Sequence, residues 1–467
     1  MEQTLIKLAY LVASVLFIIG IKMLGKTKTA RQGNAYSSAA MLVAIAATLV
    51  QVDVLSLPEI LVCILIGGGI GAYYARTVEM TSMPEMVAIF NGFGGLASVL
   101  VASSDYWLRI IEGGKANETS VVTLIGVVLS ILIGAVTATG SYIAYGKLKG
   151  LKGKLFKGSL VFPGQHLLNL ILFLVVLASA TLLVIYPEQP LYLYLVLGIG
   201  LLLGILTVIP IGGADMPVVV SLLNSYSGIA ASFTGFILNN QVLIIAGALV
   251  GASGLILTQI MCKAMNRSLI NVLLGGFGQT AVSAGSGGQE IVIKEVGVEE
   301  TAMIFDSASS VIIVPGYGMA VAQAQHIVRE MTDLLEKKNI SVKFAIHPVA
   351  GRMPGHMNVL LAEANVPYDK LIEMEQINAE FPNTDVALVI GANDVVNPAA
   401  RNDPNSPIYG MPILDVDKAR TVIISKRSMR TGYAGVQNQL FGFDNALMLF
   451  GDAKKTITEV VGELKEL

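Results

Sequence analysis

Nine apolar stretches of membrane-spanning length occupy the first 262 residues of this chain. A bilayer core requires about 20 consecutive apolar residues per helix. Charged residues make up only 14% of the 467 positions, whereas a soluble protein carries about 25%. Because lipid offers the backbone no hydrogen-bonding partners, such stretches are expected to be helices. The pattern predicts a multi-span helical membrane domain over residues 1–262, with spans at 4–24, 35–51, 57–76, 84–103, 120–145, 164–186, 189–209, 215–237 and 240–262.

Basic residues gather in alternate connections between these spans. The loops of one side, together with the segment after the ninth span, hold Lys22, Lys26, Lys28, Arg31, Lys147, Lys149, Lys152, Lys154, Lys157, Lys263 and Arg267. The loops of the other side carry only Arg109 and Lys115. Because positive charge is retained in the cytoplasm, we expect the N-terminus outside and the C-terminal part inside. The first apolar run lacks a basic leader, so we interpret it as a retained span.

Composition also narrows the classes of function and chemistry. The net charge of −2 gives no electrostatic reason to expect nucleic-acid binding. Cys63 and Cys262 lie far apart in or beside apolar segments. We therefore expect two small buried side chains rather than a disulfide.

A few polar side chains interrupt the apolar spans. Asn91 sits among Phe90, Gly92 and Phe93, and Asn224 lies in the eighth span, which begins at Asp215. Each asparagine has two possible interpretations: its side chain forms an interhelical hydrogen bond, or it is part of a polar path for a proton or ion. Asp215 has a similar pair of readings, because a helix N-cap also favours aspartate.

Strand-like and helix-like patterns alternate after residue 300, beyond a glycine-rich connection over 263–300. Alternation of this kind predicts a Rossmann-like, doubly wound parallel sheet over 301–467, with its ligand at the carboxyl ends of the strands. The expected strands are 310–315, 341–346, 385–390, 411–415, 420–425 and 445–450. The expected helices are 318–338, 355–365, 369–379, 434–441 and 452–466.

The first expected strand runs into a glycine-rich turn, Gly316-Tyr317-Gly318-Met319-Ala320-Val321. Gly316 permits a tight turn, and Gly318 lets the backbone approach a phosphate. A following helix N-terminus adds unpaired N–H groups and roughly half a positive charge. Val321 stands where the common pattern has glycine or alanine, so the motif alone is weak evidence for a dinucleotide.

Three further segments follow expected strands or lie near them. Gly391-Ala392-Asn393-Asp394-Val395 follows the third strand, and Arg352-Met353-Pro354-Gly355 lies near the second. The second strand ends at Ile346-His347, with no acid for a ribose 2′-hydroxyl, which favours a 2′-phosphorylated ligand. Ser425-Lys426-Arg427 would then supply the counter-charge, although a solvated basic turn is the alternative reading. His347 and His356 have no ligand-like spacing, and we assign no metal.

Long segments of the chain resemble the β subunit of proton-translocating NAD(P) transhydrogenase, namely 212–228, 315–325, 352–364, 391–400 and 425–441. The resemblance implies hydride transfer between NADH and NADP⁺ coupled to proton translocation in a bacterial inner membrane. It implies that NADP(H) binds here, and that NAD(H) binds an α subunit with further spans, in a dimer of α–β units.

The resemblance also implies roles for individual residues. Residues 316–321 would hold the pyrophosphate, and Lys426 with Arg427 the 2′-phosphate. Asp394 would be the catalytic acid near the nicotinamide, and Gly432, Tyr433 and Ala434 would belong to a loop that closes over the ligand. Asn91 stands where many members carry a titrating histidine, so Asn91, Asp215 and Asn224 are candidates for the proton path, with an imidazole from the α subunit.

One alternative comes from a different class of protein. A transporter or channel with a nucleotide-sensing cytoplasmic domain would also combine spans with such a sheet. It would require a substrate-sized polar site in the membrane, and the spans contain no charge pair to form one.

Overall fold

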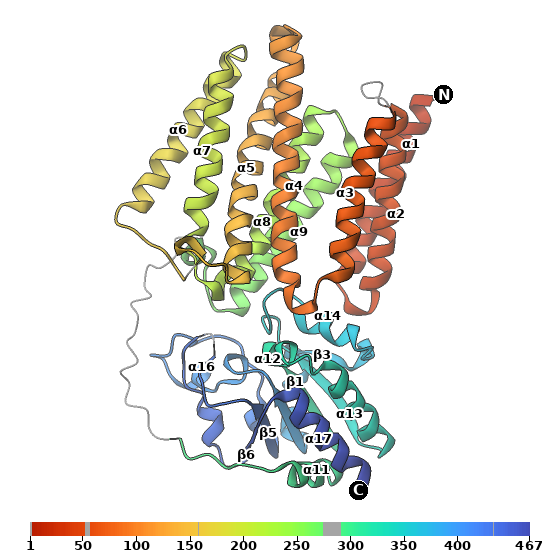
Figure 1. Ribbon diagram of the computed structural model, residues 1–467, viewed down its shortest axis with the longest axis vertical. Coiled ribbons are helices and arrows are strands. Elements are labelled where there is room, and N and C mark those ends of the chain that lie inside the picture. Colours follow the sequence, from red (N-terminus) through yellow and green to blue (C-terminus); the bar gives the residue numbers. More distant parts are fainter. Residues whose placement is uncertain (1, 52–56, 157, 274–290, 433) are drawn as a thin grey trace. The chain divides into compact units, whose positions relative to one another are not determined.

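The computed structural model describes residues 2–51, 57–156, 158–273, 291–432 and 434–467 (Figure 1). The chain forms two compact units. Unit 1 comprises Met1–Gln259 with Ile270–Phe277, and unit 2 comprises Ile260–Leu269 with Gly278–Leu467.

The helices up to residue 264 agree with the predicted spans. Nine helices among the described residues are long and apolar enough to cross a membrane. Prolines at the first turn of α4, α7 and α8 suit positions whose N–H would lack a partner. The helices are α1 (Glu2–Leu24), α2 (Thr27–Gln51), α3 (Leu57–Thr77), α4 (Met83–Tyr106), α5 (Val121–Lys149), α6 (Gln165–Ile185), α7 (Pro190–Val208), α8 (Met216–Ile237) and α9 (Gln241–Ala264).

Helix α5 is the centre of unit 1 and packs against α4, α7 and α8. Its backbone touches α4 where Gly134 faces Gly95, so a Cβ on Gly134 would lie 2.6 Å from the Gly95 carbonyl oxygen. Close approach of this kind compensates for the absence of a hydrophobic driving force between helices in lipid.

Unit 2 contains the predicted parallel sheet, with six strands in the order β3-β2-β1-β4-β5-β6. This order reverses between β1 and β4, which is the position of the ligand crevice in doubly wound folds. The strands are β1 (Ser310–Pro315), β2 (Ser341–Ile346), β3 (Leu371–Glu373), β4 (Val386–Ile390), β5 (Thr421–Lys426) and β6 (Ala446–Phe450).

The two faces of the sheet are covered differently. Ile312, Val389 and Met448 belong to a buried cluster with short helical turns, which include α15 (Met374–Ile377) and η10 (Gln439–Gly442). Residues one position away, such as Ile313 and Leu388, point to the opposite face and are fully buried. The longer helices α13 (Gln325–Lys337) and α17 (Ala453–Glu466) pack together, and α13 contacts β2 (Figure 1).

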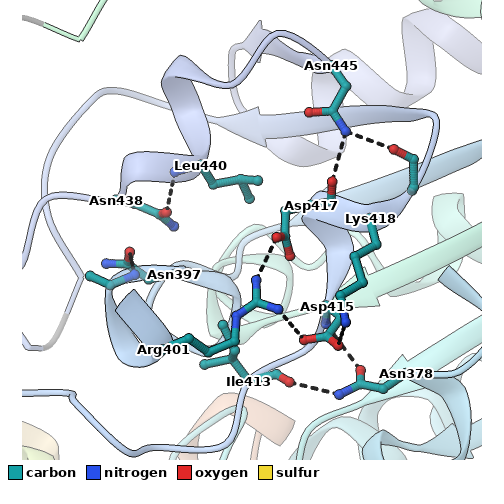
Figure 2. A network of polar contacts seen from close by, with 12 residues as sticks. Asn378, Asn397, Arg401, Ile413, Asp415, Asp417, Lys418, Asn438, Leu440 and Asn445 are labelled. Carbon is teal, nitrogen blue, oxygen red and sulfur yellow. Dashed lines mark hydrogen bonds and ion pairs between the residues drawn. The ribbon is translucent and has the colours of Figure 1, made fainter. Parts of the chain in front are cut away.

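The predicted strand 411–415 is wrong. Pro412 removes a ladder donor, and the segment is held by side chains instead. Arg401 pairs with Asp415 at 2.9 Å and with Asp417 at 2.6 Å, as Figure 2 shows. The third strand of the sheet is Leu371–Glu373, which pairs with β2 inside the predicted helix 369–379. Strand pairing there outweighs the local helical pattern.

Two predicted helices are interrupted or absent. The expected helix 318–338 is split into α12 (Tyr317–Val321) and α13, because Gln323 between them has a left-handed φ of 49°. The expected helix 434–441 is replaced by irregular backbone, with Gly435 at φ 69°, and by the short η10 turn. The remaining expected helices correspond to α14 (His356–Glu363) and α17.

The end of the expected connection 263–300 adjoins the sheet. Glu295 pairs with Met448 of β6, and α11 (Val298–Asp306) packs against α17. Where the connection ends and the C-terminal domain begins stays a prediction.

His347, at the end of β2, is a structural residue with both ring nitrogens satisfied. Its Nε2 donates to the Pro412 carbonyl at 2.8 Å, while Nδ1 accepts the Val349 N–H at 3.2 Å. Its side chain is only 2% exposed. Burial lowers the pKa of His347 from 6.5 to about 4, opposed by the hydrogen bond to Pro412.

We predict that Gly134→Val lowers the thermal stability of unit 1, because its side chain would force α4 and α5 apart. The expected cost is about 1–3 kcal/mol, the range for overpacking. Gly198→Val on α7 is the matched control, because no atom lies within 4 Å of a Cβ there. Thermal unfolding of the detergent-solubilised chain checks this, and equal melting temperatures for the two variants would contradict the packing assignment.

We predict that His347→Gln removes a pH-dependent part of the stability of unit 2. The pKa of the folded state, about 4, lies below the ordinary value of 6.5, so between these values the unfolded chain binds more protons. The contribution of neutral His347 to the free energy of unfolding, up to about 3 kcal/mol, is therefore present above pH 6.5 and is lost as the pH falls through about 4. Calorimetry of wild type, His347→Gln and the exposed control His326→Gln from about pH 7 to pH 5 checks the slope. A wild-type slope in His347→Gln would refute this role.

Candidate functional site

The turns after β1 and β4 cross in direct backbone contact at the point where the strand order reverses. The Gly316 N–H donates to the Ile390 carbonyl at 2.9 Å, and the Gly318 N–H donates to the Gly391 carbonyl at 2.9 Å. A Cβ on Gly318 would lie 2.7 Å from the Gly391 Cα. Gly391 itself has a φ of 71°, a conformation that glycine adopts without strain. Both turns thus require glycine.

A cleft of about 460 Å³ opens beside this crossing, at the carboxyl edge of the sheet. Segments after β1, β4, β5 and β6 contribute to its wall. The lining residues are Gly318, Ala322, Gly391, Ala392, Asn393, Ser425, Lys426, Arg427, Ser428, Arg430, Thr431, Gly432, Gly451 and Ala453. Exposed backbone and three cationic side chains in one cleft suit a ligand with several anionic groups.

The cleft brings together many of the residues singled out from the sequence, but not all of them. Met319 and Ala320 are fully buried, and Val321 is 44% exposed outside the cleft. Tyr433 lies outside the described residues. The predicted site residues do not include Ala322, Ser428, Arg430, Thr431, Gly451 or Ala453, which also line the cleft. Gly451 follows the last strand of the sheet, so the strand-end rule used for the other segments identifies it as well.

Lys426 ends β5 with its ammonium group near the cleft. The Nζ donates to the Arg430 carbonyl at 2.7 Å and to Asn393 Oδ1 at 3.4 Å, and it lies 4.6 Å from the centre of the Phe441 ring. Partial burial lowers the pKa of Lys426, while the nearby carboxylate of Asp394 opposes that shift. An anion in the cleft would favour the charged form of this amine.

Asp394 begins a short turn, η8 (Asp394–Val396), directly after the glycine crossing. Its Oδ2 accepts the Ala434 N–H at 3.0 Å, and its Oδ1 accepts the Asn393 Nδ2–H at 3.3 Å. Val395 lies in the same turn, and its carbonyl accepts the Leu414 N–H at 2.9 Å. The carboxylate therefore connects the segment after β4 to the loop after β5.

The segment Arg352–Gly355 follows β2 and does not line the cleft. The Arg352 guanidinium lies over the Tyr317 ring, 4.6 Å from its centre. The Arg352 N–H donates to His356 Nδ1 at 3.0 Å, and His356 is buried at the start of α14. The segment, including Met353 and Pro354, is thus attached to the β1 turn through the stacking of Arg352 on Tyr317.

In unit 1, Asn91 on α4 contacts α8 through both its side chain and its backbone. The Nδ2 donates to the Val220 carbonyl at 3.3 Å, and the Asn91 carbonyl accepts the Ser227 hydroxyl at 2.8 Å. Asn224 lies four residues after Val220, on the same face of α8. Asp215 is buried at the N-cap position of α8, but its side chain makes no capping hydrogen bond.

Metal ligation is not indicated among the residues that the structure describes. No group of three or more His, Cys, Asp or Glu side chains there is arranged to hold an ion.

Known proteins similar to the chain match over nearly its whole length. A model of the NAD(P) transhydrogenase beta subunit family matches residues 6–463. The NAD(P) transhydrogenase subunit beta of Rhodospirillum rubrum is 52% identical over 465 residues, which cover 99% of both chains. The subunit of the same name from a designated strain of that species gives the same values.

Proposed function

The chain belongs to the NAD(P) transhydrogenase beta subunit family, a family of oxidoreductases, and from this we propose its part in the reaction. It binds NADP(H) in unit 2 and exchanges hydride with NADH bound to a partner α subunit. Proton movement through unit 1 is coupled to this transfer. Hydride transfer requires two nicotinamides held together with water excluded, and no protein nucleophile. The task of this chain is therefore to position NADP(H) and to control when it binds and leaves.

The cleft at the β1–β4 crossing carries this proposal. The glycine turn Gly316–Val321 would hold the pyrophosphate, with Gly318 and Gly391 leaving the backbone accessible. Lys426 and Arg427 line the same cleft and would hold the 2′-phosphate. The end of β2 offers no acid to a ribose hydroxyl, because Ile346 and His347 stand there, and His347 is itself engaged with Pro412. Together these features favour NADP(H) over NAD(H).

Asp394 is the residue we propose for the nicotinamide end of the site. Its carboxylate is already bonded to Ala434, and Asn393 and Gly432 beside it line the cleft. A bound ligand that contacts Asp394 would compete with its hydrogen bond to Ala434, and a change in the charge of Asp394 would alter the strength of that bond. Asp394 would in this way connect the ligand to the loop after β5, in which we place Gly432, Tyr433 and Ala434. Arg352, Met353, Pro354 and Gly355 would support the site from the β2 side, through Tyr317.

In the membrane unit we propose that Asn91, Asn224 and Asp215 line the proton path. The hydrogen bonds between Asn91 on α4 and α8, the helix that carries Asn224, support this arrangement. Asparagine does not titrate, although it hydrogen-bonds water or a protonated neighbour. We therefore place the titrating imidazole on a membrane helix of the α subunit.

We further propose a bacterial inner-membrane complex with two α–β units. The charge bias of the loops supports an external N-terminus and a cytoplasmic C-terminal domain. The proposed division is a proton-translocating domain at 1–262, a connection at 263–300 and an NADP(H) domain at 301–467.

We predict that Lys426→Ala and Arg427→Ala reduce the preference for NADPH over NADH. A lost charge-assisted bond to a phosphate costs about 1.5–3 kcal/mol, or roughly 10- to 150-fold in affinity. Titration calorimetry of both nucleotides with the reconstituted complex measures this. Lys418→Ala is the control, because Lys418 pairs with Asp415 away from the cleft. Unchanged selectivity in both cleft variants would refute the assignment.

We predict that Asn91→Leu lowers proton-coupled turnover at least about tenfold, which corresponds to about 1.4 kcal/mol. The leucine keeps approximate volume but loses the polar contact with α8. NADPH binding to unit 2 should remain as in wild type. Proton uptake by proteoliposomes checks the effect, with Asn169→Leu on α6 as a control. Normal pumping by Asn91→Leu would show that this residue only packs.

A further inference from the structure

The loop between β5 and η10, described at residues 427–432 and 434–438, is attached to the segment after β4, residues 391–398, and also to Lys426, in two sets of hydrogen bonds. We call the first the cover loop and the second the β4 segment. One set of attachments lies at residues 437–438, at the end of the cover loop. The other set involves Arg430 and Ala434, in its middle. The two sets differ in burial and in chemistry.

Two buried asparagines form the attachments at the end of the cover loop. Asn438 is 1% exposed, and its Nδ2 donates to the Asn393 carbonyl at 3.0 Å. Its Oδ1 accepts the Leu440 N–H at 3.0 Å and so caps η10 (Figure 2). Asn397 is 0% exposed, and its Nδ2 donates to the Gln437 carbonyl at 3.1 Å. Its Oδ1 accepts the Ala399 N–H at 3.1 Å. Each amide therefore uses a donor and an acceptor to join two segments of backbone.

The attachments in the middle of the loop are charged and less buried. Asp394 accepts the Ala434 N–H at 3.0 Å, and Lys426 donates to the Arg430 carbonyl at 2.7 Å. Both side chains are partly exposed. Lys426 lines the cleft, and Asp394 directly follows Asn393, which lines it as well, so a ligand there comes close to both charged groups. The asparagine attachments are neutral, and the side chains that form them are almost fully buried.

We propose that Asn397 and Asn438 are positioning residues that form the fixed hinge of the cover loop. They join the end of the loop to the β4 segment, so the loop residues that line the cleft keep one position in its wall. Asn438 also holds the carbonyl of Asn393 and thereby orients Asp394, the next residue. This inference rests on the proposed function, because it takes NADP(H) as the occupant of the cleft.

Replacing each asparagine by aspartate tests the donor specifically. Asn438→Asp and Asn397→Asp keep the accepting oxygen but place a second oxygen against a backbone carbonyl. Without its donor, the hinge no longer holds the cover loop over the ligand. We expect NADPH to leave the reconstituted complex at least about tenfold faster, equivalent to about 1.4 kcal/mol. The rate is measured from the loss of bound NADPH fluorescence on dilution into excess NADP⁺.

Asn378→Asp is the matched control. Asn378 donates to the Ile413 carbonyl at 3.0 Å and accepts the Asp415 N–H at 3.1 Å, so it has the same chemistry away from the cleft (Figure 2). All three variants should be less stable than wild type, but only the hinge variants should release NADPH faster. Asn397→Asp carries the test independently if Asn438→Asp does not fold.

The outcomes separate the hinge from the proposed function. Wild-type release rates in the hinge variants, or equal acceleration in Asn378→Asp, would overturn the hinge while NADP(H) binding stands. Failure of the wild-type complex to bind NADPH would instead overturn the proposed function and this inference with it.

Discussion

The glycine crossing between the turns of β1 and β4 is the contact on which the rest of unit 2 depends. Two hydrogen bonds fix the turns against each other, and neither turn leaves room for a Cβ. This contact places the carboxyl ends of two adjacent strands at one point and exposes backbone there. Asn393 and Lys426 line the same cleft, with Asp394 directly after Asn393, because β4 and β5 are held in parallel register with β1. The chemistry of the cleft is therefore a consequence of sheet topology.

The sequence predicted the strands that carry continuous β-branched runs, because these are buried on both faces and leave a clear pattern. It failed at residues 369–379 and 411–415, where short apolar groups are ambiguous and long-range pairing decides. Leu371–Glu373 becomes a strand only because β2 lies beside it. The segment 411–415 is excluded from the sheet by Pro412 and is held by Arg401 and Asn378. Many residues that line the cleft could be anticipated because strand ends converge, whereas Ala322 and Ala453 carry no chemical signal of their own.

Asparagine side chains hold backbone carbonyls at several places in this chain without introducing charge. Asn91 does so for α8, Asn378 for the 411–415 segment, and Asn397 and Asn438 for the cover loop. A carboxylate cannot donate to a carbonyl, and a lysine brings a charge that is costly to bury. These neutral attachments fix the geometry, which leaves Asp394 and Lys426 as the charged groups that respond to a ligand.

The separation of charged from neutral attachments agrees with the proposed coupling between proton movement and NADP(H) binding. One proton crossing 100 mV supplies about 2.3 kcal/mol, and a binding equilibrium shifts only by the difference in affinity between two states. Making or breaking one or two charge-assisted hydrogen bonds, each worth about 1.5–3 kcal/mol, is of that size. A loop whose charged attachments lie beside the cleft, and whose neutral attachments are buried away from solvent, therefore has contacts of the energy scale that the proposed coupling requires.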